Sequence, residues 1–75
     1  MARSTTITAI RTILRTVDGY KKDSSAPSIS KDTDGSIYIF FHQFGQATLT
    51  TRCEECLRAH GLYVVNHYPE LIVEP

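Results

Sequence analysis

The stretch Ser36-Ile37-Tyr38-Ile39-Phe40-Phe41-His42-Gln43 decides the fold of this chain. It is rich in β-branched and aromatic residues, which favour a strand. The preceding Asp32-Thr33-Asp34-Gly35 predicts a tight turn, because Gly35 can adopt a positive φ. Apolar and polar residues do not alternate cleanly along the stretch. We therefore expect a strand that is buried on both faces and lies at the centre of a sheet.

Two elements are predicted before this strand. Ser28–Lys31 alternates in polarity and predicts a short strand, and residues 21–28, which contain Pro27, predict a flexible loop. Nearer the N-terminus a helix is predicted. Apolar residues recur there at helical spacing, after Ser4, a candidate N-cap, and before Gly19, a candidate C-terminal stop. These apolar residues are Ile7, Ile10, Ile13, Leu14 and Val17.

A second helix is predicted after the central strand, over residues 51–60. Thr51 and Glu54 match a capping box, and Gly61 is suited to end the helix. Residues 47–50 are compatible with either a short strand or the approach to this helix.

The last part of the chain predicts one strand or two. Leu62–Val65 opens a strand, and Leu71–Val73 either continues it past a bulge or returns as a hairpin. Pro69 cannot donate to a sheet ladder, so it predicts an edge or a bend.

The predicted fold is α+β, with two helices packed on one face of a small single-layer antiparallel sheet. The sheet has three to four strands, and the element order is α-β-β-α-β(-β). The 75 residues are expected to form one compact domain over residues 1–75. Such a short chain buries only roughly 60% of the surface that its unfolded form exposes. Most periodic apolar residues are then needed for the core, which favours a binding module over an enzyme.

Charge is distributed unevenly although the formal net charge is zero. Residues 1–22 carry a net charge of +4, and residues 23–75 carry −4. The longest aromatic and aliphatic run has five residues, which is too short to span a bilayer. The first residues lack the apolar core of a signal peptide, so we expect a cytoplasmic protein with reduced thiols.

Cys53-Glu54-Glu55-Cys56 raises the question of a zinc site. Together with His60 and either His42 or His67, the two cysteines supply four ligands of the right type. However, Cys53 and His60 would lie about 10.5 Å apart on one helix, at the limit of side-chain reach. The favoured interpretation is that the cysteines pack in the core and no cofactor is bound. The corresponding helix stripe is Leu49, Cys53, Cys56, Leu57 and His60.

Enzymatic chemistry has little support in the sequence, and no motif identifies a family. A thiol-redox site at Cys53 and Cys56 is the alternative to zinc, but the adjacent carboxylates oppose a thiolate. No nucleophile elbow, phosphate-binding loop or metalloprotease motif is present. A cysteine–histidine pair with His42 or His67 stays open. We expect a protein that is not an enzyme.

A nucleic-acid-binding domain is the alternative function. Its phosphate contacts would come from the basic residues Arg11, Arg15, Lys21 and Lys22. Aromatic residues of the central strand would stack bases. Against this, the pI is only about 6.8, and those aromatics lie in the segment most needed for the core.

The favoured hypothesis is a small non-enzymatic protein-binding module, an inhibitor or adaptor that docks on a partner protein. In size it looks like the antagonists of host systems that phages and mobile elements encode. Docking is expected through the basic first helix and an exposed strand edge, with Arg58, Tyr63 and Tyr68 as anchors. The edge at Leu62–Val65 would also allow a homodimer.

Overall fold

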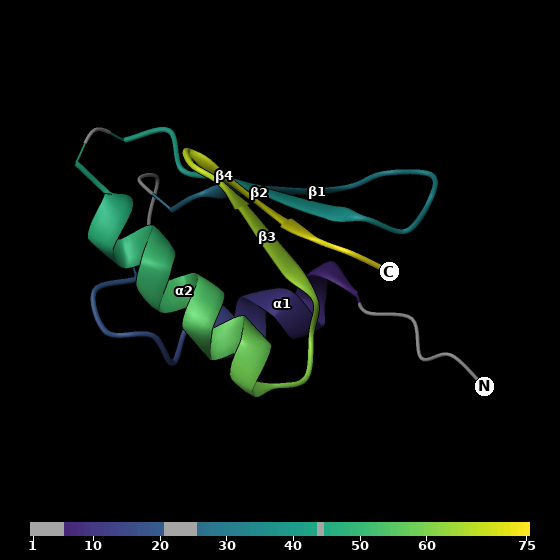
Figure 1. Cartoon of the computed structure of the whole chain (residues 1–75), viewed down its shortest axis with the longest axis horizontal. Helices are drawn as coiled ribbons and strands as arrows, with labels where there is room; N and C mark the ends of the chain where they lie inside the picture. Colours follow the sequence, from purple (N-terminus) through teal and green to yellow (C-terminus); the bar gives the residue numbers. More distant parts are fainter. Residues whose placement is uncertain (1–5, 21–25, 44) are drawn as a thin grey trace.

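The computed structural model describes residues 6–20, 26–43 and 45–75, and contains two helices and four strands. Along the chain these are α1 Ile7–Leu14, β1 Ser28–Lys31, β2 Ile37–Phe40, α2 Ala47–Ala59, β3 Val64–His67 and β4 Glu70–Val73. The strands form one antiparallel sheet in the order β1-β2-β4-β3. Both helices lie on the same side of it (Figure 1). The predicted α+β fold is confirmed, with the order α-β-β-α-β-β.

Helix α1 begins at Ile7 and is capped by Thr6, whose hydroxyl accepts a hydrogen bond from the Ala9 backbone N–H at 3.0 Å. The predicted N-cap, Ser4, lies outside the described residues. Gly19 adopts the predicted left-handed conformation, with a φ of 88°, but the helix already ends at Leu14, so the predicted position of the stop is wrong. After Leu14, backbone N–H groups donate to carbonyl groups three residues earlier. The Val17 N–H, for example, donates to the Leu14 carbonyl at 3.0 Å.

Helix α2 begins at Ala47, four residues before the predicted capping box. Thr51 does not cap the helix; its hydroxyl donates to the Ala47 carbonyl at 3.2 Å. Thr50 is fully buried and donates in the same way to the Gln46 carbonyl at 2.7 Å. The capping box is therefore wrong, because both threonines bond back inside a helix that is already formed. Residues 47–50 are helical.

The C-terminal end of α2 is as predicted. Gly61 has a φ of 84°, and its N–H donates to the Arg58 carbonyl at 2.9 Å. Leu62 N–H donates to the Leu57 carbonyl at 3.3 Å. This pair of bonds is a Schellman motif, which requires the left-handed conformation that glycine adopts at little cost.

Strands β3 and β4 form a hairpin, with Pro69 in the turn between them after a cis Tyr68–Pro69 bond. The central position of β2 is confirmed, since it pairs with both β1 and β4. Its burial on both faces is wrong. Ile37 and Ile39 are fully buried, whereas Tyr38 is half-buried and Phe40 is 43% exposed. The helices cover one face only, and successive side chains of a strand point to opposite faces.

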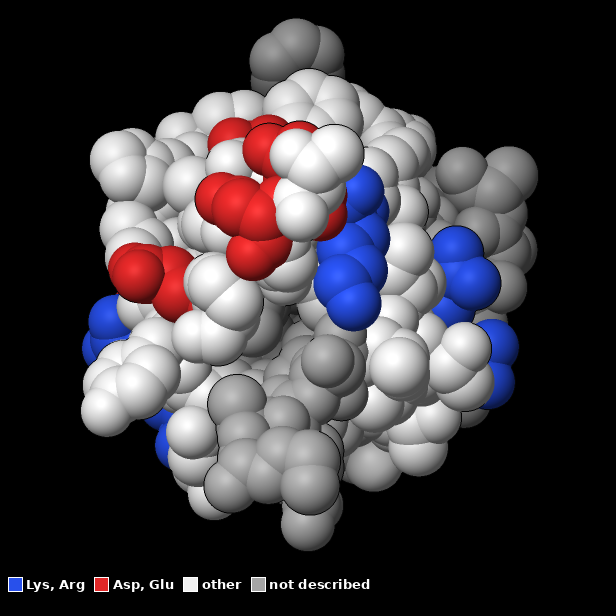
Figure 2. Space-filling view, turned by 90° about the vertical axis from the view of Figure 1, so that its right-hand side faces the viewer, with Lys and Arg blue, Asp and Glu red and all other residues white. Residues whose placement is uncertain are grey.

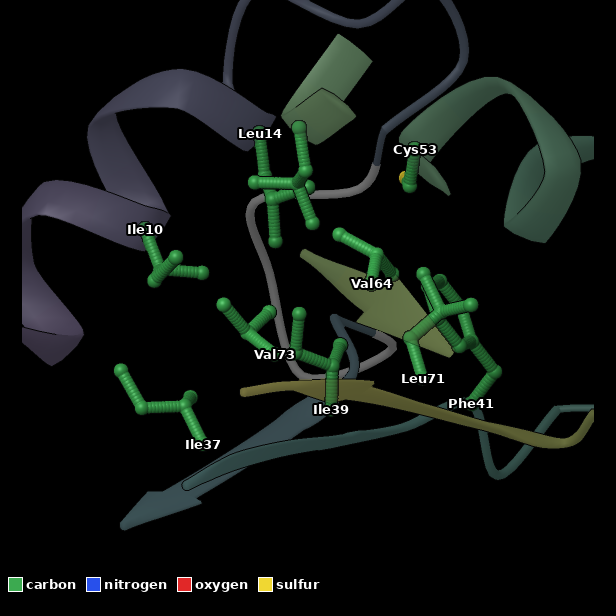
Figure 3. Packing of buried hydrophobic residues seen from close by; sticks show 10 residues of the cluster. Ile10, Leu14, Ile37, Ile39, Phe41, Cys53, Val64, Leu71 and Val73 are labelled. Atoms are coloured by element: carbon green, nitrogen blue, oxygen red, sulfur yellow. The ribbon is translucent and has the colours of Figure 1, made fainter. Parts of the chain in front are cut away.

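The core fills the space between the helices and the covered face of the sheet (Figure 3). Its buried residues are Ile10, Leu14, Ile37, Ile39, Phe41, Cys53, Leu57, Val64, Leu71 and Val73. Cys53 packs there as predicted. His60 is exposed, so its predicted place in the core stripe is wrong. The α2 stripe passes instead through Thr50, Cys53 and Leu57.

Of the loop predicted over residues 21–28, only the end is described. Pro27 is buried there, and Ser28 already belongs to β1. His42 Nε2 lies 2.9 Å from the Ala26 carbonyl oxygen and ties this segment to the end of β2.

Candidate docking surface

The uncovered face of the sheet carries two rows of side chains across all four strands. The strand register defines the rows, because residues paired across neighbouring strands point to the same side. One row is Ser30, Tyr38, Ile72 and Val65, and the other is Ser28, Phe40, Glu70 and His67. We call this surface the open face.

The centre of the open face is apolar. Phe40 is 43% exposed, and Tyr38, Ile72 and Val65 are half-buried without any helix above them. Large apolar side chains grouped on an uncovered face mark an interaction site more often than isolated exposed ones do.

The charges around this apolar centre are acidic. Burial raises the pKa of Tyr38, and the nearby carboxylates of Asp32, Asp34 and Glu70 raise it further. Lys31 is the one lysine or arginine in the four strands, and its register places it in a row of the covered face. Viewed from the side of the molecule on the right in Figure 1, acidic side chains gather together, with a basic side chain beside them (Figure 2).

A shallow cavity of about 280 Å³ adjoins the open face next to Phe40. The β3–β4 turn forms one wall, where Asn66 Oδ1 accepts a hydrogen bond from the Tyr68 N–H at 2.9 Å. The residues after β2 form the other wall, with the rings of Phe40 and His42 6.3 Å apart. The cavity is lined by Phe40, Phe41, His42, Gln43, Tyr68 and Pro69. The cavity has the character of a pocket for an apolar side chain.

Arg58, one of the predicted anchors, is engaged within the protein. Its guanidinium forms an ion pair with Glu54 at 2.8 Å and donates to the Val64 carbonyl at 2.8 Å. The predicted edge position of β3 is confirmed, but the Arg58 bond occupies a carbonyl that an added strand would need.

Tyr63 and Tyr68, the other predicted anchors, are 78% and 45% exposed. Tyr68 adjoins Phe40 at the cavity. Tyr63 lies before β3, where its carbonyl accepts a bond from Glu74 N–H at 2.9 Å.

The predicted basic residues lie on the helical layer, away from the open face. Arg11 and Arg15 are exposed and line a separate cavity with Tyr20. Lys21 and Lys22 lie outside the described residues. Of the four basic residues predicted to contact a partner here, the structure therefore describes Arg11 and Arg15 only.

The two cysteines differ in environment. Cys53 is fully buried, and burial, followed by the charge of Cys56, raises its pKa to about 12. A thiol with this pKa is a poor nucleophile at neutral pH, because the thiolate is the reactive form. Cys56 is half-buried against α1, with its sulfur 3.8 Å from Thr16 Oγ1.

The three histidines are placed separately. His42 contacts Ala26, His67 lies on the open face, and His60 Nδ1 lies 3.0 Å from the Cys56 carbonyl oxygen. In the described parts of the chain, no three histidine, cysteine or acidic side chains are grouped as metal ligands. The zinc and redox hypotheses stay predictions.

Sequence reasoning considered Tyr38 and Phe40 only as possible base-stacking residues that the core needed. It missed Ile72 and Val65 as their neighbours, and it missed the acidic surroundings. The available signal was the unbroken apolar run in the central strand, which supplies more apolar side chains than one covered face can bury.

Comparisons with protein-family models, curated proteins and solved structures find no match. Within residues 6–20, 26–43 and 45–75, no helix is long and apolar enough to cross a membrane.

Proposed function

We propose that this protein is a small non-enzymatic binding module, an inhibitor or adaptor that docks on a partner protein through the open face of its sheet. The observation that carries the proposal is the apolar group of Tyr38, Phe40, Ile72 and Val65 on a face that neither helix covers. Aromatic side chains at the centre of a patch are typical interface anchors.

A protein partner fits the open face better than a nucleic acid does. Stacking of bases on Tyr38 and Phe40 would bring phosphates near Asp32, Asp34 and Glu70. These carboxylates repel a polyanion, and the two described rows of the open face contain no lysine or arginine to neutralise it.

The charge pattern also defines the chemistry of the partner. An apolar patch flanked by lysine or arginine complements an apolar face with acidic surroundings. Two copies of this protein placed open face to open face would bring their carboxylates together. We therefore favour a different protein over a second copy. The cavity beside Phe40 would receive an apolar side chain of that partner.

The test compares two variants that each carry two substitutions. The first is Tyr38→Thr with Phe40→Thr, which removes the aromatics but keeps β-branched residues in the strand. The second is Arg11→Gln with Arg15→Gln, which alters the helical side only. Immobilised wild-type and variant proteins, with folding checked by circular dichroism, are used to capture partners from nuclease-treated and untreated lysates of the native host.

We expect a captured protein that survives nuclease treatment, is retained by the arginine variant and is lost by the aromatic variant. Binding of the purified partner is expected to weaken at high salt, because the acidic surroundings contribute to it. Retention of the partner by a folded aromatic variant would refute the role of the open face. Loss of all captured protein on digestion would favour the nucleic-acid alternative.

A further inference from the structure

The basic side of α1 carries a small cavity of about 140 Å³ that the proposed function does not use. It is lined by Arg11, Arg15, Tyr20, Ala26 and Pro27. We propose that this cavity binds a single phosphate group, with the two guanidinium groups and the Tyr20 hydroxyl as hydrogen-bond donors.

Local structure brings the three donors together. Arg11 and Arg15 are four residues apart, so they lie on the same side of α1. The chain then turns, with the Tyr20 N–H donating to the Val17 carbonyl at 3.2 Å. Tyr20 is half-buried against the core and lines the cavity together with the two arginines. The buried Pro27, which directly precedes β1, also lines the cavity.

The electrostatic situation favours an anion. Two like charges at this spacing repel each other, and no carboxylate among the described residues forms an ion pair with either arginine. The C-terminal carbonyl groups of α1 stabilise nearby cations and disfavour an anion, so a site here needs both guanidinium groups.

Tyr20 is a donor at neutral pH. Burial raises its pKa, and Cys53 acts in the same direction, whereas Arg11 and Arg15 act to lower it. The hydroxyl therefore keeps its proton, and the opposing influence of both arginines places their charges near it.

The number of donors and the size of the cavity define the ligand. Guanidinium groups bind phosphate and carboxylate oxygens in pairs. A third donor suits the tetrahedral arrangement of phosphate oxygens better than the two oxygens of a carboxylate. A phosphate that carries close to two negative charges also balances two arginines. The cavity is smaller than the roughly 300–1,000 Å³ of drug-sized sites, so it accommodates a phosphate group and not a whole nucleotide.

The test is an NMR titration of the folded protein with inorganic phosphate, O-phosphoserine and acetate at constant ionic strength. We expect saturable shifts of the backbone amide signals at positions 11, 15 and 20 with the two phosphates and none with acetate. Tighter binding of O-phosphoserine would identify a phosphate monoester as the source, and tighter binding of inorganic phosphate would identify the free ion.

Variants connect the signal to the site. Arg11→Gln with Arg15→Gln is expected to abolish binding. Tyr20→Phe is expected to weaken it about tenfold, the effect of losing a hydrogen bond to a charged group. Lys31→Gln removes one positive charge away from the cavity and serves as the control, with unchanged binding expected. The proposal is overturned by an absence of saturable shifts, by an equal response to acetate, or by undiminished binding in the double arginine variant.

Discussion

The two faces of the sheet are built from the same strands but have opposite environments. Leu71 on the covered face is fully buried, while its neighbour Ile72 on the open face keeps part of its surface in solvent. The same holds for Ile39 and Phe40 in β2. Both faces carry large apolar residues at their centre, yet the helices cover only one of them. Apolar composition is therefore shared by core and candidate docking surface, and coverage by helices separates the two.

The sharpest test of this comparison uses two adjacent residues of β4. Leu71→Ala is expected to lower the free energy of unfolding by about 2–5 kcal/mol, because it leaves a cavity in a closely packed core. Ile72→Ala is expected to cost about 1 kcal/mol or less, since it loses only cross-strand contacts on an uncovered face. Urea denaturation followed by circular dichroism measures both. Equal losses would mean that the open face is not free in solution.

The sequence predicted the order of the elements, and it did so from local signals. Turn residues such as Gly35, with its φ of 94°, and the glycine after α2 adopt the positive φ that their positions require. The centre of the sheet was predictable from the β-branched and aromatic content of β2. Strand order was not, because pairing of β2 with β4 joins segments that are distant in the chain.

The start of α2 shows where a local signal misleads. Thr51 and Glu54 have the spacing of a capping box, but that spacing also occurs inside a helix. Leu49, four residues before Cys53, continues the apolar stripe toward the true start. Here tertiary packing decides the boundary, and threonine hydroxyls that bond to earlier carbonyls replace the expected cap.

The basic character of the first helix was predictable, but the cavity that its arginines line was not. Charge asymmetry indicated a basic first helix, and two of its arginines do line a cavity. The partner of these arginines, Tyr20, follows the helix after a turn whose course the sequence does not specify. The open face was missed because an apolar run without alternation was attributed to burial on both sides, although an uncovered face has the same pattern.

The core above the covered face contains the ionisable thiol of Cys53 from α2, and its burial predicts a pH effect. The pKa of Cys53 is raised from 9.0 to about 12, so the folded state holds the proton more tightly than the unfolded state does. This contribution to stability is fully present below pH 9 and is lost as the pH rises from 9 toward 12. Between pH 8 and pH 10 the wild type is expected to lose about 1 kcal/mol more than Cys53→Ala, as measured by urea denaturation at each pH. An identical pH dependence of the two proteins would show that Cys53 is accessible to water.

At its edge the covered face carries a polar side chain, and the smallest of the expected effects on stability concerns this residue. Asn66 stands in the same row as Leu71, where α2 supplies a partner: Asn66 Nδ2 donates to Glu54 Oε1 at 2.8 Å. A double-mutant cycle with Glu54→Ala and Asn66→Ala is expected to give a coupling of about 0.5–1 kcal/mol, because this bond lies near solvent. The control cycle replaces Glu54 by the exposed Glu55 and is expected to give none. Equal coupling in both cycles would mean that general charge, and not this hydrogen bond, lets a polar residue occupy the covered face.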